Sequence, residues 1–155
     1  MSPRRARVKR IITIREKQLD DKVKALRQEQ RALAEATERA ENERQRLSHA
    51  TAERQKLEST GADAKSWLEA DEWLATRASL LDKARKHAET ATVAVDRARG
   101  FVRVAQVNVK RVELLSERME VQERSVVERA AQRLEDEIAA HRFEQTLERG
   151  KQGSR

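Results

Sequence analysis

The sequence predicts an all-α protein, namely a long antiparallel two-helix coiled-coil hairpin whose second helix is longer than the first. Three observations predict this fold: a helix-forming composition, an apolar residue at every seventh position, and one credible break in the helical pattern. Ala, Arg, Glu, Leu and Lys make up 90 of the 155 residues, a share that is typical of long helices and coiled coils. With one Pro and four Gly, the chain has few of the turn-forming residues that a β fold needs.

The first helix is expected at about residues 4–59 of a single domain that spans 1–155. Pro3 suits a helix start, because a proline at the first helical position gives up no hydrogen bond. A seven-residue apolar repeat keeps one stripe facing a partner helix. This repeat consists of Ile12, Leu19, Leu26, Leu33, Ala40 and Leu47. The companion stripe is poor, since polar residues follow Val23 at sevens, and we expect the phase to slip by three after Leu47 to Ala50 and Leu57.

The turn is expected at residues 60–62. Gly61 is the residue type found just past a helix C-terminus, and Asp63 can cap the next helix by accepting backbone N–H bonds. A short turn makes the two helices antiparallel neighbours. Folding about Gly61 then pairs residue i with a residue near 122 minus i, so Leu47 should meet Ala75.

The second helix is expected at about 63–149, followed by a basic tail at 150–155. Its first seam line is Trp67, Leu74, Leu81, Ala88, Val95, Val102 and Val109. Its second seam line is Ala84, Ala91, Ala98, Ala105, Val112, Met119 and Val126. Beyond Val126 the apolar line continues in shifted phase through Ala130, Leu134 and Ile138. Roughly the last thirty residues extend past the first helix as a single amphipathic helix, for which we expect a binding partner.

The composition argues against catalysis. Cysteine is absent, which excludes disulfides and thiolate metal sites, and the longest apolar stretch, Val93–Val95, is far too short to span a membrane. The start of the chain lacks a secretory signal, so we expect a cytoplasmic protein. The three histidines are far apart, adjacent carboxylates point apart on a helix, and no phosphate-binding loop is present. We therefore expect no catalytic residue, no cofactor, no metal and no enzyme.

Charge and aromatic residues point to binding. The net charge is +7, and residues 1–31, with 11 basic and 4 acidic residues, carry all of it. A second basic stretch, between Arg97 and Arg111, should lie beside residues 11–25. These bases suit phosphates, an acidic protein surface, or simple solubility. Trp67 fits the seam near the turn, whereas Trp73 lies beside the seam and suits either packing or a binding hot spot.

Three segments carry a resemblance to the FliJ/YscO family, the small coiled-coil proteins of flagellar export and type III secretion. RVKRIITIREKQLDDKVKAL is similar to the family's basic and aliphatic opening. SWLEADEWLATRASLLDKARKHAETATVAVDRAR has two aromatic residues six apart, followed by Ala and basic residues, as in the family's second helix. VKRVELLSERMEVQERSVVERAAQRLEDEIAAHR is similar to the closing region. The resemblance covers nearly the whole chain.

The resemblance implies a cytoplasmic stalk, peripheral to a membrane-bound secretion apparatus. Its terminal end would insert into a hexameric secretion ATPase, a surface nearer the turn would contact the export gate protein, and export chaperones would be further partners. The implied gate-binding patch is Trp73, Arg77, Leu80 and Ala84, with Asn42, Gln45 and His49 beside it. The implied ATPase-binding residues are Arg5, Arg7, Arg10, Arg15, Arg129 and Arg133. Arg77 departs from the family, which is often apolar at this position.

The free protein is expected to be a monomer without nucleic acid. Two alternatives stay open from the residues themselves. One is a basic coiled coil that binds the backbone phosphates of nucleic acid, and the other is a generic scaffold that dimerises through the second helix.

Overall fold

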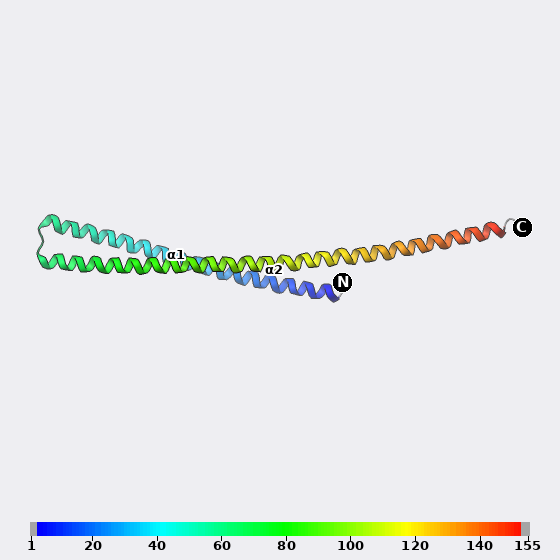
Figure 1. The fold of residues 1–155 in the computed structure, drawn as a ribbon, viewed down its shortest axis with the longest axis horizontal. Coiled ribbons are helices and arrows are strands. Elements are labelled where there is room, and N and C mark those ends of the chain that lie inside the picture. The colour runs from blue at the N-terminus through cyan, green and yellow to red at the C-terminus, as the bar shows by residue number, and fades with distance from the viewer. Residues whose placement is uncertain (1–2, 153–155) are drawn as a thin grey trace. The chain divides into compact units, whose positions relative to one another are not determined.

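The computed structural model describes residues 3–152, and it describes side chains for residues 3–149. It contains two helices, α1 at Pro3–Thr60 and α2 at Ala64–Gln152 (Figure 1). Within this part of the chain no residue forms a strand. The predicted all-α antiparallel hairpin, with its second helix longer than the first, is confirmed. Each helix begins and ends within three residues of its predicted boundary, which is the precision that helix ends allow.

The turn is built as the sequence predicts. Gly61 has a φ of 68°, in the left-handed region that glycine enters at little cost. The amide of Ala62 donates to the carbonyl of Leu57 at 3.4 Å, the six-residue hydrogen bond that closes a Schellman motif. Asp63 then caps α2, because its Oδ1 accepts the backbone N–H of Ser66 at 3.2 Å. The same carboxylate accepts the Ser66 hydroxyl, and these hydrogen bonds lower the pKa of Asp63.

The described residues form two compact units, and each unit is described by itself. The first is built from residues 3–14 and 109–152, and the second is Arg15–Asn108. In the second unit the end of α1 and the start of α2 run antiparallel on either side of the turn. Its buried core is small because the seam is rich in alanine, and it consists of Ala36, Ala50, Leu81, Val95 and Val102. In the first unit the buried residues are Val8 and Val109.

The register agrees with the predicted pairing in both units. In the second unit Glu43 contacts Arg77 and Lys22 contacts Phe101, pairs whose residue numbers add up to 120 and 123. In the first unit Arg5 contacts Glu120, and these numbers add up to 125. Arg5 also lies near Glu123, one helical turn further along α2.

The line that starts at Val23 is poor, as expected, but the predicted phase slip after Leu47 is wrong. Glu29, Ala36, Glu43, Ala50 and Leu57 are all at least half-buried at seven-residue intervals, whereas the residues that follow Val23 at sevens are exposed. The phase therefore does not slip after Leu47, since the second stripe is already in place well before it. The sequence analysis did not recognise this stripe, because Glu29 and Glu43 interrupt its apolar pattern.

The second seam line of α2 also ends earlier than predicted. It is half-buried from Ala84 through Met119, but Val126 is 66% exposed. From α1 only Arg4 and Arg5 line the hollow that contains Val126, and they leave its side chain largely exposed. Neither described helix includes a stretch that is long and apolar enough to cross a membrane.

Candidate functional site

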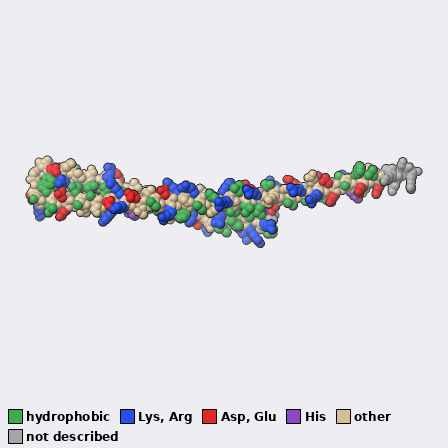
Figure 2. All heavy atoms as spheres, in the orientation of Figure 1, with side chains coloured by type: hydrophobic (Ala, Val, Ile, Leu, Met, Phe, Trp, Pro, Cys, Tyr) green, Lys and Arg blue, Asp and Glu red, His purple; other side chains and the backbone are tan. Residues whose placement is uncertain are grey.

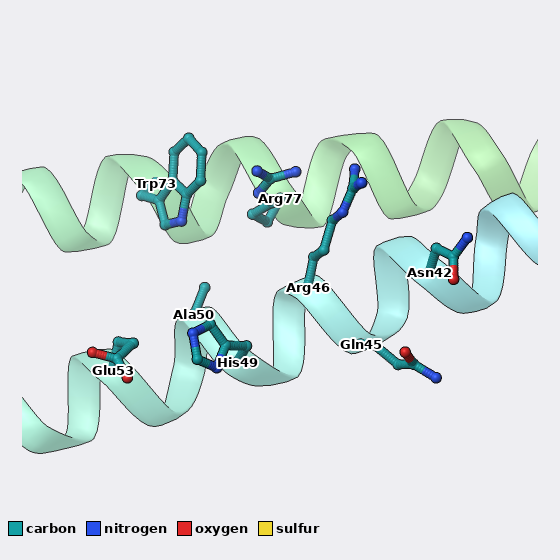
Figure 3. A pocket seen from close by; sticks show the side chains of 8 residues that line it. All are labelled: Asn42, Gln45, Arg46, His49, Ala50, Glu53, Trp73 and Arg77. Carbon is teal, nitrogen blue, oxygen red and sulfur yellow. The ribbon is translucent and has the colours of Figure 1, made fainter.

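The first candidate surface lies in the Arg15–Asn108 unit, around Trp73. A hollow of about 700 Å³ opens here between the two helices. It is lined from α2 by Trp73 and Arg77 and from α1 by Asn42, Gln45, Arg46, His49, Ala50 and Glu53 (Figure 3). We call these eight residues the Trp73 surface. Figure 3 shows Arg46 extending toward α2, whereas Gln45 points away from it.

Trp73 is held in place by a chain of charged contacts. The guanidinium of Arg77 lies 4.2 Å from the centroid of the indole ring, a distance at which a cation is attracted to the ring face. Arg77 Nη1 is also 3.4 Å from Glu43 Oε2, and Glu43 Oε1 accepts a 2.8 Å hydrogen bond from Arg46. The side chains of Arg77 and Glu43 are 18% and 16% exposed. Trp73 itself stays 51% exposed.

The structure brings together five of the seven residues that the resemblance implies for gate binding. One hollow is lined by Trp73, Arg77, Asn42, Gln45 and His49. Leu80 is 38% exposed but does not line it, and Ala84 is half-buried on the seam. The charge of Arg77, which departs from the resemblance, belongs here to a contact within the protein.

Sequence reasoning missed Glu43 and Arg46. Glu43 lies midway between the buried residues Ala36 and Ala50 at sevens, which is the signal that could have identified it. Its carboxylate sits where an apolar residue is expected, and Arg77 explains why it is tolerated: a part-buried acid needs a positive partner. Arg46 follows Glu43 by three residues, the spacing of helical neighbours.

The second candidate surface lies in the other unit, at the start of α1. Arg5 Nη2 donates to Glu120 Oε1 at 2.6 Å, and Arg5 Nη1 lies 3.9 Å from Glu123 Oε2. The hydrogen bond from Arg5 lowers the pKa of Glu120. Hollows of about 560 and 280 Å³ flank Arg5. The larger hollow is lined by Arg4, Arg5, Met119, Gln122, Glu123, Val126 and Val127, which we call the terminal surface.

The six arginines predicted for ATPase binding do not form one cluster. Arg5 is engaged with the acids of α2, whereas Arg7 and Arg10 are exposed on α1. Arg15 belongs to the other unit, where it donates to Gln18 at 3.0 Å. The remaining two are exposed residues of α2, Arg129 and Arg133.

A third exposed site, which the sequence analysis did not single out, surrounds Phe101 in the Arg15–Asn108 unit. Phe101 is 51% exposed, and the ammonium of Lys22 lies 5.1 Å from its ring centroid. Hollows of about 380 and 280 Å³ share this pair. The second basic stretch does lie beside α1 here, because Arg97 and Ala25 line the same hollow.

No group of three or more His, Asp or Glu residues among the described side chains is placed to hold a metal ion. Glu41 and Glu53 lie on exposed helix faces, and hydrogen bonds from Arg44 and Lys56 lower their pKa values. The chain matches no protein-family model, no curated protein and no solved structure.

Proposed function

We propose that the chain is a non-enzymatic cytoplasmic stalk of a type III secretion or flagellar export apparatus. Its terminal surface binds the hexameric export ATPase, and its Trp73 surface binds the export gate protein. The observation that carries the proposal is that two exposed surfaces of different chemistry occur in two separate units of one helical hairpin. The Trp73 surface is centred on an aromatic ring, whereas the terminal surface joins two arginines of α1 to apolar residues of α2.

The Trp73 surface has the properties of a protein-binding hot spot. Tryptophan and arginine are the residues most often found at the centre of such sites. Because Arg77 and Glu43 already satisfy each other, a partner can cover Trp73 without leaving a charge unpaired. The half-exposed indole ring then gains most from being covered, since large aromatic rings dominate the energetics of interfaces.

The terminal surface supports the other half of the proposal. The first eight described residues include Arg4, Arg5, Arg7, Lys9 and Arg10 and no acid. A dense positive charge speeds association with an acidic partner and makes binding depend on salt. The uncovered length of α2 beyond it offers apolar residues to the same partner.

The experiment that tests the proposal is ATP hydrolysis by a secretion ATPase from the same organism, titrated with this protein, with ring assembly followed by light scattering. Stimulated hydrolysis together with hexamer formation is expected. No effect at saturation would refute the stalk. Binding to mixed-sequence DNA or RNA that weakens steeply with salt would favour the nucleic-acid alternative instead.

The Trp73→Ala variant separates the two surfaces. It should weaken binding to the cytoplasmic domain of the gate protein about 10- to 30-fold, the loss typical of a tryptophan hot spot, and leave ATPase stimulation unchanged. Leu68→Ala is the matched control, because Leu68 is a 62% exposed apolar residue of the same helix that does not line the hollow. Loss of ATPase stimulation with intact gate binding would mean that the two surfaces are assigned the wrong way round.

A further inference from the structure

In the first unit α2 continues beyond the start of α1 with an apolar stripe that no described residue covers. Every described side chain from residue 126 to residue 149 is exposed. Val127, Ala130, Leu134 and Ile138 follow one another at intervals of three or four residues, which places them on one face of the helix. The three larger ones are 68%, 58% and 45% exposed. Figure 2 shows hydrophobic and charged side chains reaching the surface along this stretch.

This stripe continues the interface between α1 and α2. Arg5 contacts Glu120 and Glu123 of α2. Val127 and Ala130 come seven residues later, so they lie on the same face two helical turns further on. The hollows beside Arg5 already reach Val127. The face of α2 that packs against α1 therefore continues past the residues that Arg5 contacts.

The covered part of this interface shows which chemistry fits the uncovered part. α1 brings a run of basic residues without an acid to α2, whose residues 113–148 hold ten acids and five bases. Arg5 joins the two by a hydrogen bond of 2.6 Å. The uncovered residues 126–149 stay acidic, with six acids and four bases. A second copy of this stretch would bring like net charge, whereas a basic helix would bring the opposite charge.

We propose that the stripe from Val127 to Ile138 binds an amphipathic helix of a partner protein, with Lys or Arg beside its apolar face, running antiparallel to α2 and in line with α1. The inference rests on the proposed function in one respect: the export ATPase is the expected source of this helix. Apolar residues at the centre provide the affinity, and the acidic surroundings select a basic partner over an acidic one.

Two designed peptides of roughly 25 residues, long enough to form helices by themselves, serve as probes. Both carry leucine at the same heptad positions, but one has lysine and the other glutamate at the flanking positions. Binding to the full chain is measured by fluorescence anisotropy at low and high salt. The lysine peptide should bind about tenfold or more tightly than the glutamate peptide, and added salt should reduce the difference.

A matched pair of double variants locates the binding site. Leu134→Gln with Ile138→Gln should weaken binding of the lysine peptide about tenfold or more. Phe143→Gln with Leu147→Gln should leave it unchanged, because these residues are 66% and 50% exposed on the opposite face of the same helix. Glutamine is a good helix former, and ellipticity at 222 nm verifies that the variants keep their helix content.

Three results would overturn the inference. The first is equal binding of the two peptides, and the second is an equal effect of the two double variants. The third is self-association of the chain that Leu134→Gln with Ile138→Gln abolishes and the control pair does not, because a second copy would then be the occupant. The ATPase titration separates this inference from the proposed function. Selective peptide binding without ATPase stimulation would retain the inference and refute the function, whereas stimulation without peptide binding would do the reverse.

Discussion

Substitution by alanine should change the stability of the protein in opposite directions at Gly61 and at Gly100. Gly61 ends α1 with a φ of 68°, whereas Gly100 lies inside α2 with helical backbone. A Cβ added at either position meets nothing within 4 Å. Steric collision therefore contributes to neither substitution, and the backbone conformation alone decides the sign of each.

The magnitudes follow from that difference. An alanine forced into the left-handed region costs roughly 1–2 kcal/mol, part of which is offset because alanine also restricts the unfolded chain. We therefore expect Gly61→Ala to lower the free energy of unfolding by about 1 kcal/mol. Inside a helix, alanine is favoured over glycine by about 1 kcal/mol. Gly100→Ala should therefore raise the free energy of unfolding by about that amount.

The assay is thermal unfolding followed by ellipticity at 222 nm. For a chain of this size, 1 kcal/mol corresponds to about 2–4 °C in Tm, so the two variants should differ by about 4–8 °C with the wild type between them. The double variant should lie near the wild type, since distant and independent substitutions are close to additive. Gly61→Asn is the control for backbone strain and should lose less than Gly61→Ala, because asparagine enters this region more readily.

A shift of the same sign for both single variants would refute this reasoning. It would show that the Schellman turn does not set the left-handed conformation of Gly61 in solution. Gly100→Ala also tests whether this glycine serves packing, since a loss of stability would require a neighbour close to the added methyl group.

Two further predictions concern the seam and the terminal surface. Ala36→Leu should lower the free energy of unfolding by about 1–3 kcal/mol, because Ala36 is only 1% exposed and the seam has no room for the larger side chain. The control is Ala34→Leu, at an exposed position of the same helix, which should change the free energy of unfolding in urea by less than about 0.5 kcal/mol. Because Arg5 lowers the pKa of Glu120, the stability that this carboxylate provides is present above the ordinary glutamate pKa and is lost as the pH falls through the lowered one. Urea unfolding is therefore measured at one pH above this window and one below it. The free energy of unfolding should fall more between the two for the wild type than for Glu120→Gln, and equal losses would contradict the ion pair.

Much of the fold follows from the sequence alone, because its signals are local. The seven-residue repeat predicts the helices, Gly61 and Asp63 predict the turn, and the length of that turn predicts the antiparallel register. Each of these signals depends on residues that are close together in the chain, so it can be recognised without knowing how the two helices pack. The sequence also places Trp73 beside the seam, and its side chain is 51% exposed.

The rest was decided by the packing of one helix against the other. Glu43 occupies a seam position that its own residue type disfavours, and only Arg77, 34 residues further along the chain, makes it tolerable. Val126 fits the apolar repeat of α2, but it stays 66% exposed, because from α1 only two arginines line its hollow. A repeat shows which face of a helix is apolar. The length and phase of the partner helix decide how much of that face is buried, and tertiary structure alone supplies both.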